Sequence, residues 1–375
     1  MTRCTRCLYD ESIPGITFDA AGVCQYCHLH DELDAAYPVG DAGLAHLHKL
    51  AERITWDGQA HDFDCIVGLS GGCDSSYTLL LAKELGLRPA AVHFDNGWNT
   101  DTAEHNMKVV TEGLNVPLFR HTVDRDEFDS INRAFLLSGT RDFEAPTDIG
   151  LTTTLYRYAE QLGVKYIFNG HSFRTEGIAP LGWSYMDGRY IADVCKKFGG
   201  PTEFDTFPNL WLRDFVRWSL KGIKRIRPLY YVNYNKENVK ELLSERFGWR
   251  WYGGHHKESQ ITDFFMWMAY HRWGIDFRLL GWSALVRSGQ MTRELALMRL
   301  DEYIDVDQDT LVRLFERLGL TSTESQAFMW DTPKRTERDF ATYKRTFELT
   351  RPFWWAMFKT GKVPESFYRK YCVRQ

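Results

Sequence analysis

The residues with the clearest chemical potential form one short run, Ser70-Gly71-Gly72-Cys73-Asp74-Ser75-Ser76. It follows an apolar segment, Cys65 to Leu69, that is typical of a buried parallel strand, and it opens a helical pattern that stops at Gly86. Because glycine has no Cβ, the backbone at Gly71 and Gly72 can turn tightly and a ligand can approach its N–H groups. A helix N-terminus attracts anions. The run therefore predicts a phosphate-binding loop at a strand-to-helix turn.

The residue pattern narrows the kind of phosphate loop. Ser70, Ser75 and Ser76 can add hydroxyl donors, but no Gly-Lys-Ser/Thr follows and no G-x-G-x-x-G is present, which excludes a Walker loop and a dinucleotide fingerprint. Ser70-Gly-Gly-x-Asp-Ser75 instead resembles the pyrophosphate loop (PP-loop) of the ATP pyrophosphatases. That resemblance implies cleavage of ATP between its α and β phosphates and transfer of AMP to a substrate oxygen. An ordinary Gly-rich β–α turn is the alternative.

A second constellation lies at the N-terminus, where Cys4-x2-Cys7 is followed by Cys24-x2-Cys27. This spacing matches the C-x2-C…C-x2-C zinc pattern, and four thiolates form a closed tetrahedral structural site. We expect a Cys4 zinc ribbon over residues 1–30, with His28 and His30 at the surface. An iron–sulfur cluster, a redox dithiol pair and free thiols are the alternatives.

Strand and helix patterns alternate over the next part of the chain. After the first strand, three more strands are expected, over Arg88–Asp95, Val116–Arg120 and Val164–Phe168. Helices are expected between them, over 102–114, 124–138 and 147–162. Such alternation predicts an α/β fold with a doubly wound parallel sheet, in which ligands bind beyond the carboxyl ends of the strands.

Two further strand ends should therefore meet the phosphate loop. The backbone near Phe94 could read an adenine edge, Asp95 could hold substrate or metal, and Gly170 should lie beside the nucleotide. His171, Arg174 and Glu176 combine a titratable ring, a cation and a carboxylate, which could stabilise charge growing on the phosphates and bind Mg²⁺. Each turn could instead be an ordinary loop, and these three side chains could pair with one another.

The C-terminal part reads as helical, beginning with Lys236–Phe247 and a helix opened by Gly253-Gly-His-His-Lys-Glu-Ser259. Lys257 is a candidate catalytic residue there, with an exposed helix cap as the alternative. More helices are expected near 291–300, 307–318, 323–330 and 337–348. Residues 331–375 carry eleven Lys/Arg against five Asp/Glu, a pattern typical of RNA binding, of docking to an acidic partner, or of a solvated face.

Composition limits the class of protein. The 375 residues carry a net charge of −4, so no global field favours nucleic acid or an anionic membrane. No run of 18 apolar residues and no signal-peptide apolar region are present. We expect a cytoplasmic protein with four segments: the zinc ribbon (1–30), a helical connector (31–60), the PP-loop ATP pyrophosphatase domain with an HUP-like fold (61–235) and a helical C-terminal region (236–375).

The motifs occur together in one order that carries a closer resemblance: the two cysteine pairs, the Ser70 loop, Asn169-Gly-His-Ser-Phe-Arg-Thr-Glu-Gly177, Gly253–Ser259 and Ser288-Gly-Gln-Met-Thr-Arg-Glu294. The chain resembles the N-acetyl sugar amidotransferases of bacterial surface-polysaccharide biosynthesis. The resemblance implies ATP, Mg²⁺ and structural Zn²⁺ as cofactors. It also implies that the acetamido oxygen of a sugar is adenylated and then replaced by ammonia, giving an acetamidino sugar.

Nitrogen must come from outside this chain. Residue 2 is Thr and no Gly-x-Cys-x-Gly elbow occurs, so the sequence offers no glutaminase nucleophile. The resemblance implies a separate glutaminase subunit and a barrel-type partner that relays ammonia. The main alternative function is a PP-loop tRNA-modifying enzyme that thiolates or aminates a base, and a non-catalytic nucleotide-binding scaffold is the third.

Overall fold

The fold is taken from a computed structural model that describes residues 2–254, 258–304, 306, 308–321 and 331–373. Its centre is a parallel sheet in the order β3-β2-β1-β4-β5. The order reverses between β1 and β4, which makes that junction the topological switch point of the sheet. The five strands are β1 (Cys65–Gly68), β2 (Pro89–Asp95), β3 (Leu118–Thr122), β4 (Tyr166–Phe168) and β5 (Lys224–Ile226).

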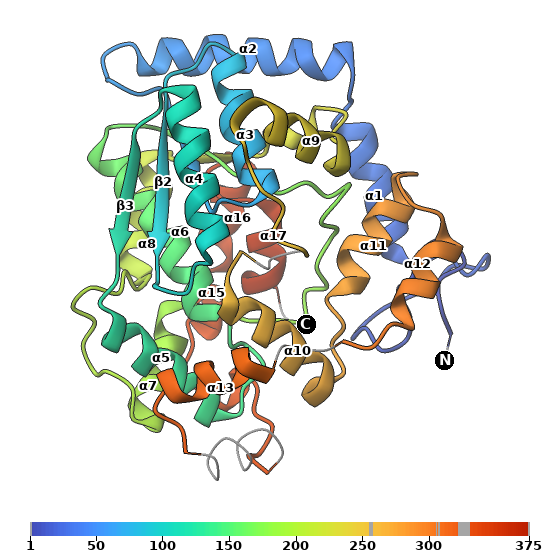
Figure 1. Ribbon diagram of the computed structural model, residues 1–375, viewed down its shortest axis with the longest axis vertical. Helices are drawn as coiled ribbons and strands as arrows, with labels where there is room; N and C mark the ends of the chain where they lie inside the picture. The colour runs from blue at the N-terminus through green and yellow to red at the C-terminus, as the bar shows by residue number, and fades with distance from the viewer. Residues whose placement is uncertain (1, 255–257, 305, 307, 322–330, 374–375) are drawn as a thin grey trace.

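Helices cover both faces of the sheet, as the predicted doubly wound fold requires (Figure 1). Side chains alternate along a strand, so Cys65 and Val67 pack with α3 (Cys73–Glu84) while Ile66 packs with α6 (Ala145–Gln161). The remaining helices of the α/β part are α4 (Asp101–Leu114), α5 (Arg125–Ser138), α7 (Gly188–Phe198), α8 (Leu212–Lys221), the 3-10 turn η1 (Pro228–Tyr230) and α9 (Lys236–Phe247).

The two ends of the chain are helical. The cysteine segment leads into α1 (Gln25–Ala36) and α2 (Asp41–Gly58). In Figure 1, α1 lies beside α11 and α12 of the C-terminal part. That part contains α10 (Gln260–Trp273), α11 (Arg278–Arg287), α12 (Arg293–Leu300), α13 (Gln308–Arg317), η2 (Glu337–Asp339), α15 (Lys344–Leu349), α16 (Arg351–Lys359), α17 (Glu365–Phe367) and η3 (Tyr368–Cys372).

The predicted helix over 337–348 is wrong. The structure has only the 3-10 turn η2 and the short α15, separated by residues 340–343. Two carboxylates of the α7 region capture the backbone there: Asp193 accepts from the N–H of Ala341 at 2.8 Å and Asp187 from that of Tyr343 at 2.7 Å. These N–H groups are therefore not available for helical hydrogen bonds. The helix expected at 323–330 lies outside the described residues.

No helix among the described residues has both the length and the apolar character needed to cross a membrane.

Candidate active site

The phosphate loop joins β1 to α3 at the centre of the sheet, as predicted. Its conformation is fixed by its own serines. The hydroxyls of Ser70 and Ser75 lie 3.2 Å apart, and Ser75 Oγ also accepts from Ser70 N–H at 3.2 Å. Gly72 N–H donates to Ser70 Oγ at 3.3 Å. Helix α3 begins directly after Gly72, so its N-terminal N–H groups lie at the floor of this loop.

Gly71 has two structural requirements that only glycine meets. Its φ is +79°, and an added Cβ would lie 2.9 Å from Ala103 Cα and closer still to the Ala103 carbonyl oxygen. The Gly71 carbonyl accepts hydrogen bonds from Asn106 Nδ2 at 3.1 Å and Trp249 Nε1 at 3.0 Å. These two buried donors fix the orientation of the loop peptide, so the neighbouring N–H groups are set in place before a ligand arrives.

Asp74 is held by two side chains that follow β5. Tyr234 Oη donates to Asp74 Oδ1 at 2.5 Å, and Lys236 Nζ lies 2.7 Å from Asp74 Oδ2. Burial alone would lower the pKa of Lys236, but the charges of Asp74 and Glu176 outweigh it and raise that pKa. The ammonium therefore remains protonated beside the loop at neutral pH, where it can meet a phosphate.

The two other predicted loop contacts lie next to Asp74. Ser76 is fully buried on α3, and its Oγ has no hydrogen-bond partner among the described residues. Gly170, after β4, lies against the loop backbone, because an added Cβ would be 3.0 Å from Asp74 C and 3.1 Å from Ser75 N. The end of β4 therefore contacts the phosphate loop, as the strand order requires.

The end of β2 presents backbone rather than side chains. The Phe94 ring is buried against Gly150 of α6, so it faces the core. Leu69 N–H donates to Val92 O at 2.9 Å, so Val92 faces β1. Along a parallel strand, the backbone N–H and C=O groups of alternate residues point to the strands on opposite sides. The backbone groups of Phe94 therefore point to the same side as those of Val92, toward β1, but beyond the end of that strand. The reading of an adenine edge by this backbone stays a prediction.

Asp95 closes the turn after β2. Its Oδ1 accepts from Gly97 N–H at 3.0 Å, and its Oδ2 lies 3.7 Å from Arg120. Arg120 also pairs with Glu104 at 2.6 Å. The Asp95 carboxylate thus has structural partners, and its role toward substrate or metal stays a prediction.

His171 follows Gly170 and faces Tyr230, whose Oη lies 3.2 Å from His171 Nδ1. Burial, with the nearby charge of Arg227, lowers the pKa of His171 to about 3. The ring is therefore neutral at physiological pH, and its role in stabilising phosphate charge stays a prediction.

Arg174 has a different environment from the one predicted. It is 7% exposed, and its guanidinium donates to Asp34 of α1 at 2.7 Å, to Tyr230 O at 2.7 Å and to Tyr37 O at 2.8 Å. These partners tie the turn after β4 to α1. The contacts favour a positioning role, and contact with phosphate stays a prediction.

Glu258 brings the C-terminal part to the loop. A Cβ on Gly72 would lie 3.1 Å from Glu258 Oε1 and 3.3 Å from Tyr252 Oη. The backbone of the same segment pairs with the turn after β2, because Thr100 N–H donates to Glu258 O at 3.0 Å. The predicted Lys257 lies outside the described residues.

The four predicted metal ligands come together. The Sγ atoms of Cys4, Cys7, Cys24 and Cys27 all lie within 4.8 Å of one another, and all four residues are buried. Three Sγ pairs are 3.7–3.8 Å apart. A tetrahedral Zn²⁺ with Zn–S bonds of about 2.3 Å requires sulfur pairs about 3.8 Å apart. The cluster therefore has the shape of a zinc site.

Donors from the C-terminal part surround this cluster. Arg287, at the end of α11, donates to Cys7 Sγ at 3.1 Å and to Cys27 Sγ at 3.4 Å. Arg293 donates to the carbonyls of Cys4 at 3.0 Å and Cys7 at 3.3 Å. A cation beside four thiolates on Zn²⁺ offsets their excess negative charge.

One expectation for this segment is wrong. His28 is half-exposed and pairs with Asp19 at 2.9 Å, but His30 is 3% exposed and packs edge-on against Phe173, with ring centroids 5.1 Å apart. Burial lowers the pKa of His30 to about 4. Helix α1 begins inside the cysteine segment, so His30 faces the protein interior.

Sequence reasoning missed Tyr234, Lys236, Trp249 and Arg287. Tyr234 lies 160 residues from its partner Asp74, and no motif links the two. The only sequence signal was the Tyr-rich stretch before the α9 pattern, where Lys236 is the first helical residue.

The fold and site together define a class. The chain is an α/β protein whose five-stranded parallel sheet carries a Ser-Gly-Gly-x-Asp-Ser loop of the PP-loop type at its switch point. It also has a four-cysteine cluster that could bind zinc and a helical C-terminal part.

Comparison with known proteins agrees with this class. Residues 258–358 match the family described as LPS biosynthesis protein WbpG-like, C-terminal domain. An uncharacterized protein of Methanocaldococcus jannaschii is 25% identical over 243 residues, 64% of this chain and 73% of that relative. The tRNA-specific 2-thiouridylase MnmA of Bacillus cytotoxicus is 27% identical over 146 residues, 35% of this chain and 36% of the thiouridylase. The chain therefore spans about a third of that enzyme's length.

Among solved structures, the NH3-dependent NAD synthetase from Campylobacter jejuni overlaps 76% of this chain and 96% of the synthetase, at 13% identity and a TM-score of 0.28. Residues 258–358 thus resemble a domain named for LPS biosynthesis, and a stretch of 146 residues resembles a tRNA-specific thiouridylase.

Proposed function

We propose that the chain is an ATP-dependent amidotransferase that adenylates the acetamido oxygen of an N-acetyl sugar and replaces this oxygen with ammonia, releasing pyrophosphate and AMP. One observation carries the proposal. The WbpG-like segment begins at residue 258, and the Glu258 carboxylate lies against Gly72 of the phosphate loop. The segment with the WbpG-like match thus begins beside the loop in which we propose that ATP binds, which supports a sugar site next to the nucleotide.

The chemistry requires activation, because the nitrogen of an acetamide donates into its carbonyl and makes it a poor electrophile. Transfer of AMP to the carbonyl oxygen gives an imidate with a good leaving group. Ammonia then adds to the carbon, and AMP departs with the oxygen. No covalent enzyme intermediate is needed, so positioning and charge stabilisation are sufficient.

In this proposal each part of the loop has a task. The N–H groups at Gly71 and Gly72 bind the departing pyrophosphate, and Lys236 adds a positive charge 2.7 Å from Asp74. Mg²⁺, with Asp74 as a ligand, would neutralise charge on the phosphates. His171 would donate or accept a hydrogen bond as a neutral ring. The backbone of Phe94 would bind the adenine edge.

Partner and cofactor assignments are part of the same proposal. Ammonia would come from a separate glutaminase subunit through a barrel-type relay partner. Zn²⁺ on the four cysteines would be structural, since four thiolates fill a tetrahedral shell.

The cysteines argue against the rival function, tRNA thiolation. Outside the metal cluster, the four thiols are those of Cys65, Cys73, Cys195 and Cys372, and all are buried. Burial raises the pKa of Cys73, the one inside the loop, to about 12. Because thiolation needs a thiolate nucleophile, none of these is suited to carry sulfur.

The test is a turnover assay with ATP, Mg²⁺ and ammonium, to which a panel of acetamido sugars and bulk tRNA are added in turn. Pyrophosphate and AMP released only with a sugar, and a sugar product in which NH replaces oxygen, support the proposal. Release that depends on tRNA would overturn it in favour of base modification.

A further inference from the structure

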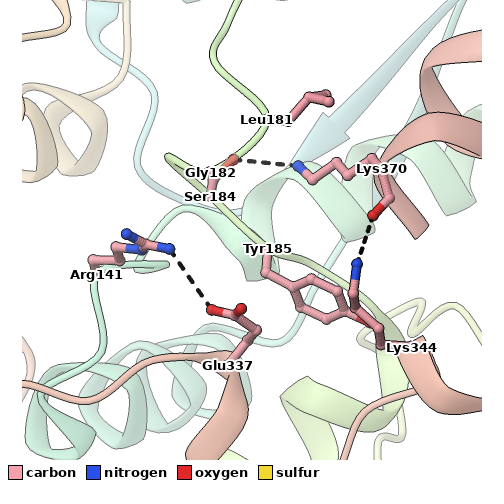
Figure 2. A pocket seen from close by; sticks show the side chains of 8 residues that line it. All are labelled: Arg141, Leu181, Gly182, Ser184, Tyr185, Glu337, Lys344 and Lys370. Atoms are coloured by element: carbon pink, nitrogen blue, oxygen red, sulfur yellow. Dashed lines mark hydrogen bonds and ion pairs between the residues drawn. The ribbon is translucent and has the colours of Figure 1, made fainter. Parts of the chain in front are cut away.

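A small pocket lies apart from the phosphate loop, at the junction of the basic C-terminal segment with the α/β part (Figure 2). It has a volume of about 40 Å³. Its lining comes from the loop before α6, the segment after β4 and the C-terminal helices. The lining residues are Arg141, Leu181, Gly182, Ser184, Tyr185, Glu337, Lys344 and Lys370.

The lining has three cations against one carboxylate, Glu337. Arg141 Nη2 lies 3.7 Å from Glu337 Oε2, which is too far for a hydrogen bond. Neither Arg141 Nε nor Glu337 Oε2, both buried, has a hydrogen-bond partner among the described residues. Guanidinium donors are thus present in the pocket without acceptors at bonding distance.

Among the described residues, each of the two lysine ammonium groups has one hydrogen-bond acceptor nearby. Lys344 Nζ donates to Lys370 O at 2.8 Å, and Lys370 Nζ has Ser184 Oγ at 3.5 Å. An ammonium carries three donors, so these contacts leave further donors for a ligand. Figure 2 shows Arg141 and Glu337 on one side of the pocket and the lysines on the other.

Nearby acidic residues do not offset the cost of burying the Lys370 ammonium. Asp142 is 2% exposed and accepts from Tyr185 N–H at 2.8 Å and Tyr190 Oη at 3.1 Å, so its carboxylate is used behind the pocket. Burial lowers the pKa of Lys370 even though Asp142, Asp148 and Glu337 act in the opposite direction. The carboxylates present therefore do not compensate for burying this ammonium.

The volume fits a small group. A cavity can hold one water when the centre of that water can move within about 10–15 Å³. By the same measure, a pocket of about 40 Å³ has room for about three atoms of this size. A carboxylate or the oxygens of one phosphate match that size, and both accept hydrogen bonds from Arg and Lys.

The pocket lies toward the edge of the sheet where ligands bind. Arg141 precedes α6, which leads back to β4, so the N-terminus of α6 is near the carboxyl ends of the strands. Ser184 and Tyr185 belong to the segment that follows β4. A ligand that reaches the phosphate loop and extends away from it can therefore approach this pocket from the same edge.

We infer that this pocket is a second anion-binding site, which takes one carboxylate or phosphate group. Arg141, Lys344 and Lys370 donate to the oxyanion, and Ser184 orients Lys370. The anionic group belongs either to the sugar substrate, an assignment that rests on the proposed function, or to a free phosphate compound.

Lysine footprinting on the full chain with its metal tests the site directly. Inorganic phosphate is titrated, the protein is briefly acetylated, and modification is read at each lysine by mass spectrometry. We expect acetylation of Lys344 and Lys370 to fall toward zero as phosphate saturates the pocket. Lys334, an exposed lysine of the same segment, is the matched control and should not change. Because the readout is assigned to single residues, phosphate bound at the Ser70 loop does not interfere.

A variant adds a second measurement. Arg141→Gln should move the midpoint of protection to about tenfold higher phosphate, since it removes a charged hydrogen-bond donor. Lys334→Gln should leave the midpoint in place. Equal acetylation of Lys344 and Lys370 with and without phosphate, and with acetate as the second probe, would overturn the site.

The same measurement of lysine acetylation distinguishes the two possible sources of the anionic group. Protection by acetamido sugars that carry an acid group, absent with neutral ones, assigns the pocket to the sugar. Protection by phosphate and AMP alone assigns it to a free phosphate compound. If the proposed function fails, no sugar releases pyrophosphate, yet the phosphate titration still reports on the pocket.

Discussion

The ammonium of Lys236 lies 2.7 Å from the carboxylate of Asp74, although the two residues are 162 positions apart along the chain. Asp74 belongs to the first turn of α3, and Lys236 opens α9. The phosphate loop is therefore completed by a charge from the segment after the last strand. This relationship underlies the first two predictions.

Replacement of Asp74 by Asn keeps the shape of the side chain and removes its charge. We expect Asp74→Asn to abolish pyrophosphate release while the circular dichroism spectrum stays unchanged, because the neutral amide is a poorer Mg²⁺ ligand than a carboxylate and forms no ion pair with Lys236. Asp62→Asn, at an exposed position, is the control. Full turnover by the Asp74 variant would remove this carboxylate from the mechanism.

Lys236→Met should reduce stability as well as activity. The side chains of Lys236 and Asp74 are only 16% and 15% exposed, and breaking a buried pair costs about 3 kcal/mol because the remaining carboxylate loses its cation. Urea unfolding measures this free energy. The double variant with Asp74→Asn should be more stable than Lys236→Met alone, and equal stability of the two would show that the pair is not coupled.

Gly71 and Gly86 have nearly the same backbone conformation, so replacing each by Ala distinguishes a steric clash of the new Cβ from the cost of the left-handed conformation alone. Gly71 has φ +79° and Gly86 has φ +77°, but only Gly71 has atoms within 4 Å of an added Cβ. Gly86→Ala should cost about 1–2 kcal/mol of stability for the left-handed conformation and keep activity. Gly71→Ala should lose ATP binding, measured by calorimetry. ATP binding of wild-type strength in Gly71→Ala would contradict the close packing on Ala103.

Arg287 should control how firmly the cysteine cluster keeps its metal. Purified protein should carry one zinc per chain, and Arg287→Met should weaken zinc affinity about 10–100-fold, as loss of an outer-shell donor does. Transfer of zinc to a chromogenic chelator measures this, with Arg299→Met, exposed on α12, as the control. Iron or no metal in the purified protein would contradict the zinc assignment.

The neutral His171 predicts a pH dependence of stability. Its pKa in the folded protein is lowered to about 3, below the ordinary value of about 6.5. Between these values the unfolded chain binds a proton that the folded chain does not, so stability is lost as the pH falls below about 6.5. His171→Asn should flatten this slope by up to about 1.4 kcal/mol per pH unit between pH 6 and 4. Identical slopes for the variant and the wild type, measured by urea unfolding, would mean that His171 has the same pKa in the folded and the unfolded protein, which would contradict its burial as a neutral ring.

The parts of the fold that were predicted correctly have strong local signals. Strands β1, β2 and β4 are apolar runs next to Gly or Asn turns, so their residue types alone predict that they are buried. Strand β5 is Lys-Arg-Ile and half-exposed, and it was not among the predicted strands. Helix α7 was not predicted, although Asp187 caps its start and Gly199, with φ +75°, ends it.

The sequence predicts those residues of the site that belong to one short, contiguous motif. The cysteine pairs and the serine loop carry their chemistry within a few residues, so spacing alone indicated them. The environment of Arg174 could not be predicted in this way. Its partners Asp34 and Tyr37 come from α1 and from the residue that ends this helix, and no local sequence pattern indicates that α1 packs there. The division into four segments and the roles of the site residues stay predictions.

The most direct test of the central claim follows the nitrogen atom. The protein is incubated with ATP, Mg²⁺, ¹⁵N-labelled ammonium and each acetamido sugar, and the product is analysed by mass spectrometry and ¹⁵N NMR alongside AMP. The account predicts one ¹⁵N in an acetamidino group for each AMP formed. Formation of AMP with the label in tRNA, or with no label in any sugar, would contradict it.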